Sequence, residues 1–184
     1  MVALAALASA TEIRLSFGVL ERLLAQQLFT EEGRKYVKGN KSARCNFAYL
    51  EHPKIWGKDG RLSIQARFTG KAAIDLMGRC MGTGDAFDLT VTGVPYFLDG
   101  NVAFKDVAIA TSRDGFYIRR VKVALRDTLS KEFKYNIATD AKRLMEQPDP
   151  GQPYQRKLMR FDVSSIQVAN DALVLAVDFV LAVQ

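Results

Sequence analysis

The order of apolar and polar positions divides this chain of 184 residues into several strands and two helices. Apolar residues alternate with polar ones from Leu62 to Phe68 and again from Phe87 to Val91, which is typical of strands with one buried face. In a strand that starts at Val102, the alternation of apolar and polar positions shifts by one residue at Lys105 and Asp106 and then resumes with Val107. Such a slip predicts a β-bulge that bends the sheet strongly.

Two segments have helical spacing. A leucine-rich stripe follows Ser16, a good N-cap residue, and this helix is expected to end near Thr30. The segment from Phe116 to Gln147 is predicted to be one long helix that lies diagonally across a twisted sheet, stopped by Pro148. Its apolar residues recur at intervals of four: Val121, Leu125, Leu129, Phe133, Ile137, Ala141 and Met145.

The closing segment from Leu173 to Val183 is apolar at both alternating sets of positions, and only Asp178 interrupts it. A strand of this kind must be covered on both faces. The segment from Phe161 to Val168 is expected to pair with it in a hairpin through a turn at Asn170 and Asp171.

Strands grouped between helices, without regular alternation of strand and helix, indicate an α+β fold. We therefore expect a long helix wrapped by a strongly curved, mostly antiparallel sheet, with a shorter N-terminal helix. Residues 11–184 are expected to form a single domain, since no linker or repeat divides them. The glycine-rich residues 78–84 are expected to form a loop.

Residues 1–10 are either the remainder of a signal peptide or an N-terminal segment of the domain. An apolar run ends in the small residues Ala8, Ser9 and Ala10, the pattern that signal peptidase cleaves, but no basic residue precedes the run. This segment favours export, so a periplasmic or secreted location is expected, with a cytoplasmic location as the alternative.

The net charge of +6 and the isoelectric point near 9.4 are compatible with anionic membranes, with nucleic acid or with solubility alone. Basic residues are spread along the chain, and the motifs of nucleic-acid-binding folds are absent from the sequence, so nucleic acid is not an expected partner. Cys45 and Cys80 are too far apart in sequence for a metal or redox pair. They form either one disulfide or two independent thiols, and their sequence positions favour two independent thiols.

Catalytic chemistry is not expected. His52 is the only histidine, neither cysteine has a histidine beside it, and Gly82 and Gly84 precede a strand, unlike a phosphate-binding loop. We expect no enzyme, no metal site and no cofactor.

The apolar faces allow two interpretations. In the first, they fill one core. In the second, a curled sheet leaves a groove beside the long helix that holds an acyl chain, and each buried methylene of the chain contributes about 0.8 kcal/mol to binding. The groove hypothesis assigns the lining to Leu24, Ile64, Phe68, Phe87, Leu89, Phe104, Leu125, Leu129, Phe133, Val177 and Phe179.

The order of these segments resembles the YceB-like small envelope lipoproteins of bacteria, in the tubular lipid-binding (TULIP) superfamily. The likeness rests on several segments: Ile13 to Leu28, Leu62 to Gly70, Phe87 to Gly100, Val102 to Ala110, the long helix with Leu125, Leu129 and Phe133, and the closing segments. It implies a long helix in a half-barrel of antiparallel strands, with an apolar tunnel for lipid. Unlike a lipoprotein, the chain has no cysteine after its leader-like segment, so a free exported form is expected.

The expected function is therefore non-enzymatic binding or carriage of a fatty acid or phospholipid chain, with peripheral contact to anionic membranes. The alternative is a structural or protein-interaction domain of the envelope, with a filled core. The oligomeric state stays open.

Overall fold

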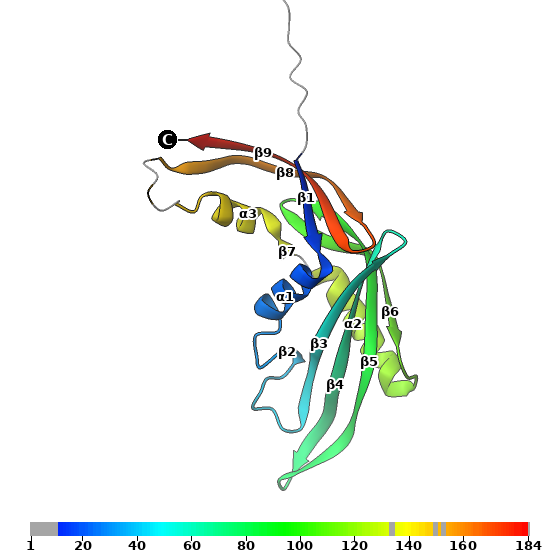
Figure 1. Ribbon diagram of the computed structural model, residues 1–184. Helices are drawn as coiled ribbons and strands as arrows, with labels where there is room; N and C mark the ends of the chain where they lie inside the picture. The colour runs from blue at the N-terminus through cyan, green and yellow to red at the C-terminus, as the bar shows by residue number, and fades with distance from the viewer. Residues whose placement is uncertain (1–10, 133–134, 149–150, 152–153, 184) are drawn as a thin grey trace, which may run out of the picture.

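The structure is a computed structural model that describes residues 11–132, 135–148, 151 and 154–183. It has an α+β fold, as predicted, with two antiparallel sheets and three helices in these residues. Figure 1 shows the smaller sheet above the larger one, with α1 where the two meet. The leader-like residues 1–10 lie outside the described residues.

The larger sheet has six antiparallel strands and curves into a half-barrel (Figure 1). The order of strands in this sheet is their order in the sequence, so each strand is joined to its neighbour by a turn, a loop or a helix. The strands are β2 (Arg34–Lys38), β3 (Asn46–Lys58), β4 (Arg61–Leu76), β5 (Arg79–Leu98), β6 (Asn101–Thr111) and β7 (Tyr135–Asn136).

Two of the register shifts in this sheet contain a residue with positive φ, and they accompany the curvature. The register of β5 with β6 shifts between Thr92 and Val94, and Asp106 on β6 has a φ of 53°. The predicted slip at Lys105 and Asp106 is thereby confirmed as a bulge. A second shift lies between Glu51 and Lys54 of β3, where His52 has a φ of 55°. An extra residue on one strand increases its twist and bends the sheet.

The smaller sheet contains β1 (Thr11–Ser16), β8 (Arg156–Val168) and β9 (Ala172–Val183), with β9 in the centre. The predicted closing hairpin is confirmed. β9 is covered less than the prediction of two buried faces required: Leu173, Leu175 and Val177 on one face are buried, Val174 and Ala176 on the other are half-buried, and Phe179 and Val180 are exposed. β1 pairs with β9 only as far as Val177, which explains why cover is lost there in the described residues.

The single long helix predicted for residues 116–147 is wrong. The structure has α2 (Phe116–Glu132), then β7, then α3 (Ile137–Met145). Tyr135 and Asn136 pair with β6, and the side chain of Asn136 accepts a hydrogen bond from the Thr139 amide, 2.8 Å away. An N-cap of this kind starts a new helix. The apolar residues recur every four positions across the break as well, so their periodicity alone did not reveal that the helix is interrupted.

The N-terminal helix, α1 (Phe17–Gln27), begins after Ser16 as predicted and is one turn shorter than expected. α2 covers part of the concave face of the larger sheet. Leu125 and Ile118 of α2 lie in a buried cluster with Phe68 and Phe87, whose ring centroids are 5.0 Å apart.

The glycine-rich loop predicted for residues 78–84 is also wrong. β4 and β5 pair without interruption as far as Leu76 and Arg79, and only Met77 and Gly78 form the turn. Gly82 lies within β5, where an added Cβ would be 2.3 Å from the carbonyl oxygen of Ala72. This glycine therefore permits close approach of the two strands and does not mark a loop.

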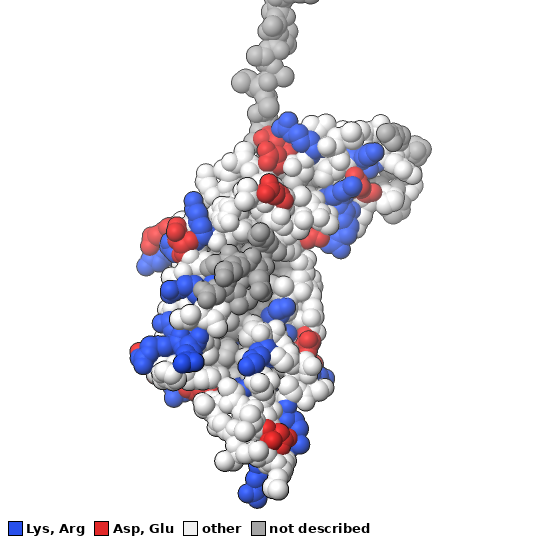
Figure 2. Space-filling model, turned by 180° about the vertical axis from the view of Figure 1, so that it is seen from behind, with Lys and Arg blue, Asp and Glu red and all other residues white. Residues whose placement is uncertain are grey.

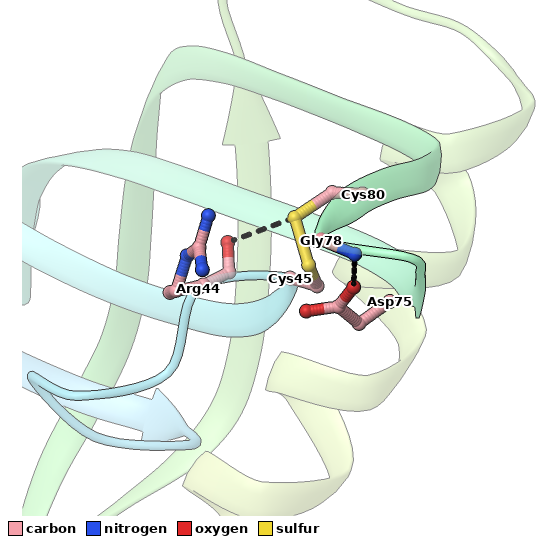
Figure 3. The surroundings of a disulfide bond; sticks show 5 residues. All are labelled: Arg44, Cys45, Asp75, Gly78 and Cys80. Atoms are coloured by element: carbon pink, nitrogen blue, oxygen red, sulfur yellow. Dashed lines mark hydrogen bonds between the residues drawn. A yellow bond between two sulfur atoms is a disulfide. The ribbon is translucent and has the colours of Figure 1, made fainter.

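Cys45 and Cys80 form a disulfide, so the preference for independent thiols was wrong (Figure 3). Their Cα atoms are 5.2 Å apart because the β4–β5 hairpin brings Cys80 back beside the residue that precedes β3. The bond encloses a separation of 35 residues. Closing a loop of that length restricts the unfolded chain and stabilises the native state by about 4 kcal/mol.

We expect the double variant Cys45→Ala, Cys80→Ala to lose about 4 kcal/mol of unfolding free energy, because its unfolded chain is no longer restricted. Urea titration followed by Trp56 fluorescence would measure the change, with wild-type protein in reductant as the matched control. Equal midpoints for oxidised, reduced and variant protein would contradict a stabilising role.

Candidate functional site

An apolar pocket with a volume of about 250 Å³ lies on the concave side of the larger sheet. Its floor follows from strand register: Leu62, Ile64 and Ala66 of β4 face Gly93, Val91 and Leu89 of β5. Alternate residues of paired strands share one face, so these form a continuous wall. The rest of the lining comes from α1 and the residues after it, the neighbouring strands and α2: Leu24, Leu28, Phe29, Lys35, Val37, Leu50, Phe104, Val107 and Leu125.

A second pocket of about 200 Å³ continues from the first toward the smaller sheet. α1 forms one side of it, and Leu173 and Leu175 of β9 form part of another. The two pockets share five lining residues: Leu24, Leu28, Leu62, Ile64 and Phe104. We call the two pockets together the apolar groove.

Few polar side chains line the apolar groove. Among the described residues, Lys35 is the only charged one in the lining of the first pocket, and it is solvent-exposed at the edge formed by β2. Gln27 and Tyr135 are the polar residues of the second pocket. The interior therefore offers burial for hydrocarbon, with hydrogen-bonding groups confined to a few positions.

The polar residues of the second pocket belong to a short hydrogen-bonded chain. Gln27 Nε2 donates to the Tyr135 hydroxyl over 3.1 Å, the hydroxyl donates to Asp140, and Arg143 pairs with Asp140 at 2.8 Å. Burial raises the pKa of the Tyr135 hydroxyl, and the hydrogen bond to Asp140 raises it further. The phenol thus stays protonated at neutral pH and ties α1, β7 and α3 together.

The structure brings five of the expected lining residues to the apolar groove: Leu24, Ile64, Leu89, Phe104 and Leu125. Phe68 and Phe87 lie instead in the buried cluster under α2, and Val177 lies in a separate cluster of the smaller sheet. Phe179 is exposed on the outer half of β9. Phe133 and the side chain of Leu129 lie outside the described residues.

Other lining residues were missed by sequence reasoning. Leu28 was part of the apolar stripe of α1, so a signal for it existed. Lys35 and Val37 lie on β2, whose sequence Arg-Lys-Tyr-Val-Lys has too many charges to stand out as a strand beside a pocket. Only its pairing with β3 places it there.

His52 lies in the β3 bulge, and no group of three or more potential metal ligands occurs among the described residues. The one buried polar residue found there, Ser63, shares a hydrogen bond of 3.0 Å with Thr92. None of the helices described here is both long and apolar enough to cross a membrane.

No family model, curated protein or solved structure matches the chain at a significant level. The resemblance to YceB-like proteins therefore stays a prediction.

We expect Tyr135→Phe to lower the unfolding free energy by about 1 kcal/mol, since Asp140 and Gln27 each lose a hydrogen-bond partner. Urea titration measures this. Tyr154→Phe, which makes the same change at an exposed tyrosine, is the control and should change nothing. Equal losses in both variants would show that the hydrogen-bonded chain has no special role.

Proposed function

We propose that the protein binds or carries a hydrophobic ligand, a fatty acid or a phospholipid acyl chain, without catalysing a reaction on it. The observation that carries this proposal is the apolar groove, whose two pockets share five residues and have few polar side chains. Its volumes, about 250 and about 200 Å³, together correspond to the lower part of the usual range for small-molecule sites, roughly 300–1,000 Å³.

Burial of hydrocarbon alone is sufficient for useful affinity. At about 0.8 kcal/mol per methylene, ten buried methylenes contribute roughly 8 kcal/mol. Losses of translational and conformational freedom offset part of this value. An acyl chain that occupies both pockets therefore binds more tightly than one confined to a single pocket, because each added methylene leaves water.

The polar end of the ligand belongs at Lys35. This ammonium group is the only charge that the described residues contribute to the lining of the first pocket, and it is exposed to solvent. A carboxylate or phosphate beside it remains hydrated on its outer side and gains a charge-assisted hydrogen bond. The acyl chain then extends inward past Ile64 and Phe104, two of the five residues common to both pockets.

Membership in the YceB-like group of the TULIP superfamily, and a periplasmic or secreted location, are part of the same proposal. The strongly curved antiparallel sheet supports the first. The Cys45–Cys80 disulfide supports the second, since such bonds persist in oxidising compartments.

A protein-interaction role is the second candidate, and one feature favours it. Beyond Val177, the described part of the chain gives β9 a partner on one edge only, and the apolar side chains there are exposed. A partner strand or a second copy would cover this region. The exposed residues are Met159, Phe179, Val180 and Val183.

We expect native mass spectrometry of protein purified from a bacterial host to detect bound fatty acid or phospholipid. Ile64→Trp should remove that mass and lower affinity for a fluorescent acyl probe about tenfold or more, because the larger side chain fills space common to both pockets. Circular dichroism checks that the variant is folded.

Ile74→Trp is the matched control, since it makes the same substitution on the same strand at an exposed position. Its probe affinity should equal that of wild type. A wild-type protein that is free of lipid and also refuses the acyl probe would rule out carriage and leave the interaction role.

We expect Lys35→Glu to weaken binding of a fatty acid probe about tenfold, while binding of a neutral probe of equal length changes little. The reason is that a carboxylate replaces the cation beside the anionic end of the ligand. Lys38→Glu, a like charge change on the same strand at a residue outside the lining, is the control. Equal effects of both variants would contradict a head-group role for Lys35.

A further inference from the structure

The far end of the β4–β5 hairpin exposes a cluster of large apolar side chains. Four of them lie within eight residues of chain: Ile74, Leu76, Met77 and Met81. Met77 is fully exposed, and the exposed fractions of Ile74 and Met81 are 63% and 59%. Figure 1 shows this hairpin end projecting beyond the rest of the sheet at the bottom of the view. We call these four residues the hairpin tip.

Strand register places the hairpin tip on one face. Ile74 is paired with Met81, and Leu76, two residues farther along β4, is on the same side. The opposite face has the pair Asp75 and Cys80 and is tied to Cys45 by the disulfide (Figure 3). The apolar face is therefore exposed, with no described element packed against it, whereas the other face is held by the disulfide.

The turn of this hairpin differs from two comparable turns of the same sheet. Asp59 and Gly60 join β3 to β4, and Asp99 and Gly100 join β5 to β6; all four residues have positive φ. Asp or Asn followed by Gly is the usual choice for such two-residue turns.

Between β4 and β5 the equivalent pair is Met77 and Gly78, with φ of 53° and 79°. Methionine has no short polar group to compensate for this backbone conformation, so it is the less favourable residue for the turn. This turn thus has a strained, fully exposed apolar residue at the position where the other two turns have aspartate. Turn stability does not account for that choice.

The turn is nevertheless held in place. The Asp75 carboxylate accepts a hydrogen bond from the Gly78 amide at 2.8 Å (Figure 3). The disulfide joins Cys80, two residues after the turn, to Cys45, which precedes β3. Presenting the tip in a fixed conformation reduces the entropy lost when it binds.

Positive charge lies beside the apolar apex and behind it. Arg79 is paired with Leu76, Lys71 lies farther back on β4, and Arg44 precedes Cys45. Figure 2 shows Lys and Arg atoms among uncharged ones at this lower end of the molecule, with a smaller group of Asp or Glu atoms. Lys71 and Arg44 are set back from the apex, and the long side chain of Arg79 can extend back from beside the turn, so the charges match the order of layers in a bilayer, acyl chains below anionic phosphates.

We propose that the hairpin tip docks the protein on a membrane containing anionic phospholipid, with Met77 and Leu76 entering the acyl boundary and Lys71 and Arg79 contacting phosphate groups. A convex apex with cations beside and behind it fits a planar bilayer better than a protein pocket, which would have to enclose it. This inference goes beyond the proposed carriage of lipid and does not require the apolar groove to be occupied.

The test is co-sedimentation of the full chain with vesicles of phosphatidylcholine alone, or of phosphatidylcholine mixed with phosphatidylglycerol. We expect binding to the mixed vesicles that weakens as salt is added. Met77→Asn should reduce that binding about tenfold or more, because burial of the methionine side chain is lost. Asparagine suits the turn, so this variant should fold at least as stably as wild type.

Leu76→Asn and Leu98→Asn form a matched pair, since each leucine is exposed and directly precedes a two-residue turn of the same sheet. Only Leu76→Asn should weaken vesicle binding. Wild-type protein that does not sediment with mixed vesicles, or tip variants that bind like Leu98→Asn, would overturn the proposal and leave the tip as a contact for another protein. Affinity for the acyl probe, measured on the same samples, reports on the apolar groove separately, so either proposal can fail alone.

Discussion

The pairing of β4 with β5 is the constraint on which the rest of this structure depends. It runs without a register shift from Leu62 opposite Gly93 to Leu76 opposite Arg79. Because side chains alternate between the faces of a strand, this one register decides three things in succession along the hairpin. It aligns the wall of the apolar groove, then the stacked Phe68 and Phe87, and finally the exposed hairpin tip.

A shift of one residue in this register would move every one of these side chains to the opposite face. The disulfide opposes such a shift, because Cys80 reaches Cys45 only when it is paired beside Asp75. Gly82 also restricts it, since the strands approach there too closely for a side chain. The cystine and this glycine thus have the same structural purpose, although neither lies in the groove.

The curvature of the larger sheet explains why the apolar groove exists. Bulges near His52 and Asp106 bend strands that flank β4 and β5, so their concave side chains diverge from a flat layer. Two short helices, α1 and α2, cover this face from separate positions, and the space between their contacts remains as the two pockets. A single long helix would cover the sheet along one line, whereas the break at β7 lets Tyr135 and α3 contact the second pocket as well.

What the sequence by itself determined was local. Alternation located the strands around Leu62 and Phe87, the slip at Asp106 identified a bulge, and turn residues identified the closing hairpin, because each of these depends on neighbours within a few positions. Tertiary structure decided the rest. The end of α2 depends on the pairing of Tyr135 and Asn136 with β6. The bond between Cys45 and Cys80, and the choice of Phe104 for the groove but Phe68 for the core, depend on strand register and helix cover. Contacts between distant residues follow from how elements pack, and one sequence pattern is compatible with several packings.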